Sequence, residues 1–221
     1  VFSGQYFSEW DREIHVVKPF EIPAYWKRFR SLDYGLDCTA CYWWAVSQDK
    51  RCFVYRELYE SNLNLSQAAK KILEMTPPDE HISYTVASPD LWNRRQDTGI
   101  AGVEVMAKAG LHAMVKADDR RVAGWRALKE YLESYEDNGV KVARLAVFET
   151  CTNLIRTLPA LVRDPNDPED IDDSCEDHAA ESIRYGIMSR PPVTIEREEN
   201  ERRRMRRRRV IAPVVSRVTG Y

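Results

Sequence analysis

Three β-rich runs follow one another between residues 29 and 58 and are separated only by short polar turns. The runs read FRSLDYG, TACYWWAVSQD and RCFVYREL, and the turns read GLDC and QDKR. Such short turns join antiparallel neighbours, because parallel strands need a much longer crossover connection. The pattern therefore predicts a three-strand antiparallel meander in the first part of the fold.

Helical and strand-like segments alternate after this meander. Apolar spacing predicts a helix over Leu65–Met75 with Ser66 as its N-cap, and the run ISYTVASPD predicts a buried strand that ends at Pro89. The remaining predicted elements are a helix over 100–109, a strand over 111–117, a helix over 122–135, a strand over 143–148, and helices over 151–162 and 174–188. This order predicts an α/β fold in which a mixed sheet, made of the antiparallel meander and parallel strands, is flanked by helices.

The length of 221 residues and the hydrophobic content of 43% are sufficient for one sizeable core. We expect residues 1–28 to pack on the domain as an N-terminal segment and residues 29–192 to form the domain itself. Residues 193–221 have few core residues and are expected to form a flexible, Arg-rich tail. Residues 163–177 form an acidic, proline-containing loop of a length that is often functional or mobile.

The charge is unevenly distributed along the chain. The formal net charge is -2, but residues 202–209 contain seven arginines, and without them the chain has 26 basic and 35 acidic residues. An acidic domain suits a polyanionic partner only where its carboxylates hold cations. Within the basic run, Arg202, Arg203 and Arg204 are candidate phosphate contacts, although a solvated segment or a protein-docking segment has the same composition.

Other conspicuous residues favour packing over chemistry. Five cysteines, an odd number without a signal peptide, indicate reduced thiols in a cytoplasmic setting. Cys38 and Cys41 spell C-x-x-C, but no second ligand pair accompanies them, so we expect no structural zinc. Trp43 and Trp44 could stack on bases, but they point to opposite faces of a strand, so we expect at least one in the core and favour core or sheet-face packing for the pair. No apolar run approaches the roughly 18 residues of a membrane span, so no membrane partner is expected.

Three acids occur at related points of the predicted fold. Asp33 alternates with Leu32 and therefore points to the opposite face of the first strand, whereas Asp90 directly follows a later strand and Asp177 lies near the start of the last helix. Each acid alone is also typical of a turn or a helix cap. Together they can converge at one sheet edge, where like charges require divalent cations or raised pKa values.

Four segments, in this order and with these gaps, resemble the C-terminal nuclease domain of tailed-bacteriophage terminase large subunits. They read SLDYG, SPDLWNRRQDTG, RLAVFETCTNLIRTLPAL and DHAAESIRYG, and the resemblance extends over residues 29–189. It implies an RNase H-like fold and a metal-dependent endonuclease that cuts concatemeric double-stranded DNA during genome packaging in the cytoplasm of the infected bacterium. The implied partners are DNA, a packaging ATPase domain, the portal and the small terminase subunit. The chain has no phosphate loop, so we expect no ATPase activity from it.

The resemblance also implies the site residues. Asp33, Asp90 and Asp177 match the three acids, with His178 and Glu181 close to the metals. Glu181 stands where many relatives have Asp. Two hard cations about 4 Å apart activate water and neutralise the leaving oxygen, and carboxylate ligands suit Mg²⁺ or Mn²⁺. In this hypothesis Asp33 bridges the two ions, Asp90 and Asp177 each complete one, and His178 or Glu181 ligates a metal or orients water.

Lys116, Arg120 and Arg121 follow a predicted strand and match a family segment near the active edge. They are candidate phosphate contacts, although a solvated turn has the same composition. Two other functions stay open from the sequence alone. One is another RNase H-like nuclease of the resolvase or transposase type, and the other is a non-catalytic DNA-binding or assembly module with the same fold.

Overall fold

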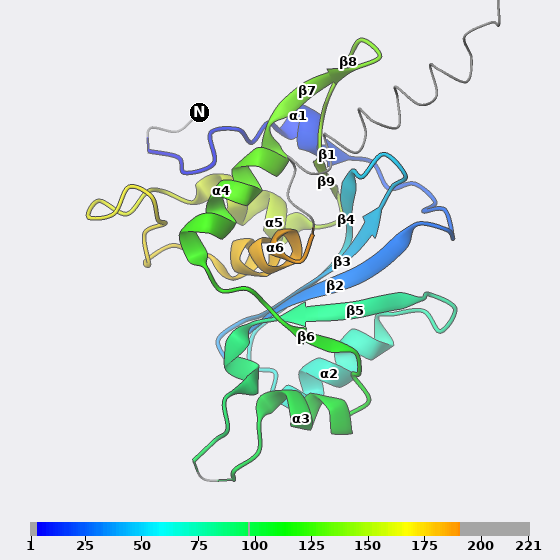
Figure 1. Ribbon diagram of the computed structural model, residues 1–221, viewed down its shortest axis with the longest axis vertical. Coiled ribbons are helices and arrows are strands. Elements are labelled where there is room, and N and C mark those ends of the chain that lie inside the picture. Colours follow the sequence, from blue (N-terminus) through cyan, green and yellow to red (C-terminus); the bar gives the residue numbers. More distant parts are fainter. Residues whose placement is uncertain (1–3, 97, 191–221) are drawn as a thin grey trace, which may run out of the picture. The chain divides into compact units, whose positions relative to one another are not determined.

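A seven-stranded mixed sheet forms the centre of the structure, a computed structural model that describes residues 4–96 and 98–190 (Figure 1). The strands of this sheet are β1 (Val16–Val17), β2 (Lys27–Tyr34), β3 (Thr39–Val46), β4 (Cys52–Glu60), β5 (Ile82–Ala87), β6 (Met114–Lys116) and β9 (Leu145–Phe148). Their spatial order is β1-β9-β4-β3-β2-β5-β6. The Arg-rich run of residues 202–209, with Arg202, Arg203 and Arg204, lies outside the described residues.

The pairing within the sheet follows the predicted topology. β2, β3 and β4 form an antiparallel meander, and β5 then joins β2 in parallel. β6 extends this side in parallel with β5, and β9 pairs in parallel with β4 on the other side. The predicted fold class, a mixed α/β sheet flanked by helices, is therefore confirmed.

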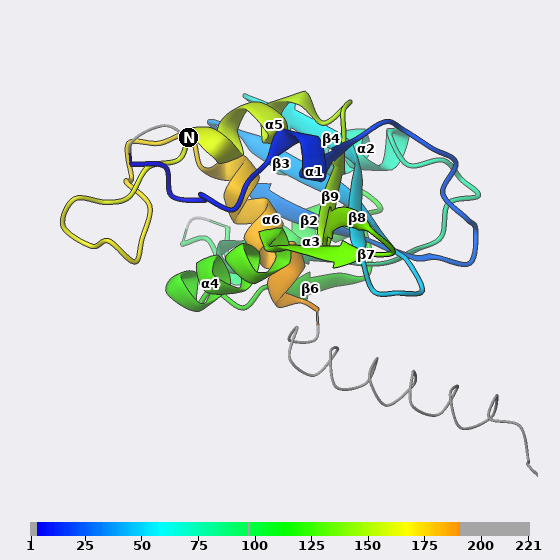
Figure 2. The ribbon, with the colours of Figure 1, turned by 90° about the horizontal axis from the view of Figure 1, so that it is seen from above.

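Helices cover both faces of the sheet. The helical elements are α1 (Arg12–His15), α2 (Leu65–Glu74), η1 (Pro89–Trp92), α3 (Gly102–Lys108), α4 (Arg121–Leu132), α5 (Thr152–Thr157), η2 (Leu158–Ala160) and α6 (His178–Met188). α6 packs against β2, β3 and β5, and α4 packs on α6, whereas α2 and α3 pack together on the opposite face (Figures 1 and 2). No helix among the described residues is long and apolar enough to cross a membrane.

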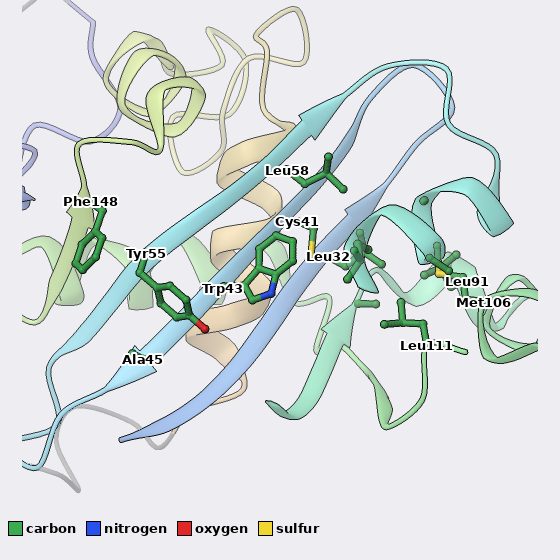
Figure 3. Packing of buried hydrophobic residues seen from close by; sticks show 14 of the residues in the cluster. Leu32, Cys41, Trp43, Ala45, Tyr55, Leu58, Leu91, Met106, Leu111 and Phe148 are labelled. Carbon is green, nitrogen blue, oxygen red and sulfur yellow. The ribbon is translucent and has the colours of Figure 1, made fainter. Parts of the chain in front are cut away.

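Alternation along β2 and β3 divides the core between the two faces. Leu32 and Trp43 belong to the cluster on the α2–α3 side, which Figure 3 shows together with Met106 of α3. On the α6 side, Phe29 stacks on Trp44 with ring centroids 5.3 Å apart. Trp43 and Trp44 are both fully buried, so their predicted role in core packing is confirmed.

Some predicted element ends were wrong, and two of them have a local cause. The cap of α2 is Asn64, not Ser66, because Asn64 forms a reciprocal capping box with Gln67. The last helix begins at His178 rather than at residue 174. The helix predicted over 122–135 ends at Leu132, because a hairpin follows it.

This unpredicted hairpin consists of β7 (Ser134–Asp137) and β8 (Val140–Ala143). Its turn is Asn138-Gly139, and both residues have positive φ, 50° and 79°. Asn-Gly is a preferred sequence for such a two-residue turn, so the signal for the hairpin is present in the sequence. At the other end of the chain, the N-terminal segment supplies α1 and the edge strand β1, which pairs in parallel with β9.

We predict that Gly186→Ala destabilises the fold by about 1–3 kcal/mol, the usual cost of overpacking a core. A Cβ at Gly186 would lie 2.4 Å from Cζ2 of the fully buried Trp44. Gly→Ala in an unobstructed helix instead stabilises by about 0.5–1 kcal/mol, so the sign of the effect is diagnostic. Urea unfolding followed by tryptophan fluorescence measures it, and an unchanged or increased free energy of unfolding would contradict the close α6–β3 contact.

Candidate active site

The carboxyl ends of three parallel strands meet at one edge of the sheet. Leu32 of β2 is in register with Ala87 of β5, and Ala87 is in register with Lys116 of β6. Asp33 is the next residue on β2, and Asp90 lies three residues beyond Ala87 in η1. Ligand sites in open α/β sheets are typically at such an edge. The structure therefore brings Asp33, Asp90 and Lys116 to the same side of the molecule.

A contact between β2 and α6 brings the start of the last helix to this edge. The hydroxyl groups of Ser31 and Ser182 are 3.1 Å apart, and Ser31 also accepts a hydrogen bond from Trp44 Nε1 at 2.8 Å. Two residues of a strand span about 6.7 Å, and one helical turn rises about 5.4 Å. The residue one turn before Ser182 therefore lies beside Asp33, two positions after Ser31. That residue is His178, whose Nδ1 is 3.1 Å from Asp33 Oδ2.

His178 lies between two carboxylates. Its Nδ1 contacts Asp33, and its Nε2 is 3.1 Å from Oδ2 of Asp37, an exposed residue in the β2–β3 turn. The hydrogen bond to Asp33, reinforced by the charges of Asp33, Asp37 and Asp177, raises the pKa of His178 to about 9. At neutral pH the ring is therefore an imidazolium that donates to both acids.

Asp177 occupies the N-cap position of α6, but its side chain does not cap the helix. Its carboxylate instead faces Arg121, with Oδ2 3.4 Å from an Nη atom. Burial and the charge of Asp33 raise the pKa of Asp177, although Arg121 and His178 act in the opposite direction. Asp177 is therefore not the simple helix-capping acid that the sequence also allowed.

Glu181 is buried one turn further along α6 and is held by two arginines. Its Oε2 accepts from Nε and Nη2 of Arg184 at 2.8 and 2.5 Å, and its Oε1 is 3.3 Å from Arg121. Burial raises the pKa of Glu181, and the charges of Arg184 and Arg121 oppose this rise. Both oxygens of Glu181 therefore face arginines, and the contact of Oε2 with Arg184 is shorter than that of Oε1 with Arg121.

Asp90 is more separate from this group. It is exposed, and its Oδ1 accepts a hydrogen bond from Asn93 at 3.2 Å. Its charge nevertheless reaches the phenol of Tyr185 on α6. Burial raises the pKa of Tyr185, and Glu181, Asp33 and Asp90 all add to that rise. Tyr185 therefore lies within the electrostatic reach of acids from β2, η1 and α6.

The basic candidates differ in their surroundings. Lys116 is exposed at the end of β6. Arg120 is paired with Asp118, with an Nη–Oδ2 distance of 2.6 Å. Arg121 contacts four carboxylates and stacks on an indole ring. Lys116 is thus the most available of the three for an outside anion.

Within residues 4–96 and 98–190, no group of three or more His, Cys, Asp and Glu side chains stands close enough together to hold a metal ion. Arg121, Arg184 and protonated His178 balance the acids instead. The donor set nevertheless fits a hard cation, because carboxylate oxygens are the ligands that Mg²⁺ and Mn²⁺ prefer, and an imidazole nitrogen would add to them only once His178 had lost its proton. Burial and the charge of Asp33 raise the pKa values of Asp177 and Glu181, so added positive charge stabilises the ionised forms of these two acids.

Three further residues at the site escaped sequence reasoning. Asp37 was assigned only to a turn, although that turn continues from the strand that carries Asp33. Arg184 is three residues after Glu181, a spacing at which helical side chains meet, so a signal for this pair existed. Asp170 lies in the acidic loop and bonds Arg121 at 2.8 Å, and nothing in the sequence singles it out among its acidic neighbours.

No family model and no curated protein matches the chain, but solved structures share its fold. The nuclease domain of the phage P22 large terminase has a TM-score of 0.67 at 21% identity, covering 85% of this chain and 92% of that one. The large terminase of a thermophilic bacteriophage has a TM-score of 0.64 at 16% identity, covering 83% and 44%. The nuclease domain of the bacteriophage SPP1 large terminase, solved with bound Mn, has a TM-score of 0.54 at 18% identity, covering 81% and 95%.

The chain therefore has the RNase H-like fold of the nuclease domains of phage large terminases. Both the resemblance expected from the four sequence segments and the predicted fold class are confirmed at the level of the fold. The match covers about 44% of the length of the thermophilic phage's large terminase.

We predict that Asp170→Asn lowers the free energy of unfolding by about 1–3 kcal/mol at pH 7, the usual range for a hydrogen-bonded charge. Burial acts to raise the pKa of Asp170, but bonds from the Ile171 amide, Arg121 and Trp125 outweigh it and the pKa is lowered. This stabilisation is present above pH about 4 and is lost as the pH falls through the folded-state pKa. Urea unfolding at pH 7 and pH 3 measures the difference. Asp173→Asn is the control, because Asp173 is 90% exposed and 3.6 Å from Arg121; equal losses in both variants would contradict the prediction.

Proposed function

We propose that this chain is a metal-dependent DNA endonuclease domain of a viral genome-packaging terminase, hydrolysing the phosphodiester bonds of concatemeric double-stranded DNA with little sequence preference. The observation that carries the proposal is the meeting of Asp33, at the end of a central strand, with His178 and its neighbouring acids at the start of α6. The shared fold with terminase nuclease domains supports it.

The proposed metal-holding residues are Asp33, Asp90 and Asp177, with His178 and Glu181 beside them. Divalent ions bound there would activate water for attack on phosphorus and neutralise the leaving oxygen. Mg²⁺ and Mn²⁺ both suit the donors. The Mn bound in the SPP1 nuclease domain supports Mn²⁺ as one of the metals that this site would use.

The protein residues themselves have distinct tasks in this proposal. Asp33 lies on a rigid central strand and provides the fixed carboxylate of the site. His178 is oriented by hydrogen bonds at both ring nitrogens, so its ring plane is fixed relative to Asp33. Arg184 fixes Glu181 through two hydrogen bonds to one oxygen, which leaves the other oxygen facing Arg121. Such support from a second layer of residues is what a precise site requires.

DNA would approach along the carboxyl edge of the sheet. Lys116 is exposed there and is a proposed phosphate contact. Arg95 joins it as a candidate, because its charge acts on the phenol of Tyr34, the last residue of β2; burial raises the pKa of Tyr34, and Arg95 opposes this. Arg120 and Arg121 are already engaged by carboxylates and are therefore weaker candidates.

The proposal also covers organisation and partners. Residues 29–192 would form the nuclease domain, and residues 193–221 an Arg-rich tail in which Arg202, Arg203 and Arg204 contact phosphate or another packaging component. The thermophilic phage protein that shares this fold is a large terminase of which the match covers less than half, which supports linkage to a packaging ATPase. We also propose that the protein works with the portal and the small terminase subunit, in the cytoplasm of the infected host.

A non-catalytic DNA-binding or assembly module is the second candidate function. The observation that favours it is the pairing of the site acids with Arg121, Arg184 and His178, because carboxylates neutralised by the protein itself do not require a metal. Metal binding without DNA cleavage by the folded protein would support this second candidate.

We predict that Asp33→Asn lowers the rate of plasmid cleavage by more than about 100-fold, since even outer contacts to a metal site typically contribute about 10- to 100-fold. Nicking and linearisation of supercoiled plasmid are followed with Mn²⁺, with Mg²⁺ and with EDTA, and circular dichroism confirms the fold. Asp49→Asn is the matched control, because Asp49 is an exposed acid in the turn at the other end of β3. Cleavage in EDTA, or full cleavage by the Asp33 variant, would reject the proposed site.

We predict that Lys116→Gln weakens DNA binding and reduces the salt dependence. One lost phosphate contact makes the slope of log K against log salt concentration shallower by about 1. Fluorescence anisotropy with a labelled duplex, in the Asp33→Asn background to prevent cutting, measures the slope at several salt concentrations. Arg120→Gln carries the same charge change nearby in the chain but removes a side chain already paired with Asp118, so its slope should change less. Equal slopes for wild type and Lys116→Gln would exclude this contact.

A further inference from the structure

Arg121, the first residue of α4, lies among carboxylates from two other parts of the chain. Its Nε bonds Asp170 of the acidic loop at 2.8 Å. Its Nη atoms are 3.4 Å from Asp177 and 3.3 Å from Glu181, and a weaker contact of 3.6 Å reaches Asp173. One contact is therefore short and the others are longer, so the guanidinium has an anchored side and a loosely held side.

The anchored side is fixed independently of the candidate active site. Asp170 also accepts from Trp125 Nε1 at 2.8 Å, and the guanidinium carbon of Arg121 lies 5.6 Å from the centre of the Trp125 ring. The Trp125 side chain is fully buried, so this platform does not move easily. Arg121 thus keeps a firm attachment even when its contacts to α6 are lost.

The loosely held side meets two largely buried acids. The side chains of Asp177 and Glu181 are only 22% and 10% exposed, so their carboxylates have lost much of their hydration and require a nearby positive charge. Arg184 satisfies Oε2 of Glu181, so Arg121 is the cation that faces Oε1 of Glu181 and Oδ2 of Asp177. Arg121 therefore neutralises two of the carboxylates that are proposed to hold a divalent ion.

We propose that Arg121 is a resident counter-cation of the acidic site, which neutralises Asp177 and Glu181 when no divalent ion is present and competes with that ion for them. The proposal rests on the proposed metal site and assigns a regulation to it. Because Asp170 retains Arg121 after the exchange, the guanidinium returns when the ion leaves. Arg121 is in this sense a positioning residue that sets the metal concentration at which the site fills.

The direction of the effect separates this role from a merely structural one. A residue that only supports the site weakens metal binding when it is removed, whereas removal of a competing cation strengthens metal binding. Two cations that share ligands are linked reciprocally, so the metal also weakens the hold of Arg121 on Asp177 and Glu181. The metal-free protein, in contrast, loses stability without Arg121, because its acids then repel one another without compensation.

The test compares wild type, Arg121→Gln and Arg120→Gln as intact chains. Arg120 is the matched control, because it precedes Arg121 directly, carries the same charge and is paired with Asp118 alone among the acids of the described segments. Isothermal titration measures Mn²⁺ affinity, and thermal unfolding measures stability in EDTA. We expect Arg121→Gln to bind Mn²⁺ about tenfold more tightly, near the low end of coupling between linked sites. We also expect it to unfold at a lower temperature in EDTA, with Arg120→Gln close to wild type in both measurements.

The outcomes are distinguishable. If the wild-type protein binds Mn²⁺ and folded Arg121→Gln binds it equally well or more weakly, the proposed competition by Arg121 is wrong. The proposed nuclease function is not affected by that result. Absence of Mn²⁺ binding by every folded protein would reject the proposed metal site and the competition with it. Where Arg121→Gln does not fold, Arg121→Lys replaces it, because lysine keeps the charge but lacks the fork that reaches Asp170 and α6 together. Tighter Mn²⁺ binding by that variant supports the proposal, and unchanged or weaker binding overturns it.

Discussion

The packing of α6 on the centre of the sheet determines where every other group of the candidate active site lies. Gly186 lets the helix approach Trp44, and the Ser31–Ser182 contact fixes its height along β2. From that point the rise of a helix and the rise of a strand bring His178 beside Asp33 without any further adjustment. A shift of α6 by one residue would turn His178 away from β2, so the geometry of the site depends on the exact seating of this helix.

This seating concentrates negative charge, and the protein has to balance it. Two like charges about 4 Å apart repel by about 4 kcal/mol at the effective dielectric constant of a protein surface, which is a large fraction of typical domain stability. The described structure uses three protein cations for this purpose, namely Arg121, Arg184 and protonated His178. In the proposed function the same carboxylates would have two sets of partners, those inside the protein and divalent ions from solution. The balance between these partners would then depend on the residues around the acids rather than on the acids themselves.

The sequence predicted those parts of the structure that depend on local patterns. Short turns between β-rich runs predicted the meander, and strand alternation correctly put Asp33 on the face opposite Leu32. The sequence did not predict which acids would find partners, because Asp170 and Asp173 are indistinguishable by local context, yet only Asp170 reaches Trp125. It also missed the end of α4, where the Asn138-Gly139 turn outweighs the helical pattern before it.

The comparison with terminase nuclease domains also separates what the backbone determines from what the side chains determine. At identities of 16–21% the shared fold shows that this backbone arrangement tolerates extensive substitution. Backbone geometry of this kind specifies only where a carboxylate will stand, namely at the ends of β2 and β5 and at the start of α6. Whether such a carboxylate is open to a metal depends on neighbours such as Arg121 and Asp170, which come from α4 and the acidic loop. If Arg121 acts as proposed, two chains with this fold can hold the same acids at the same points and still differ in the metal concentration at which those acids bind an ion.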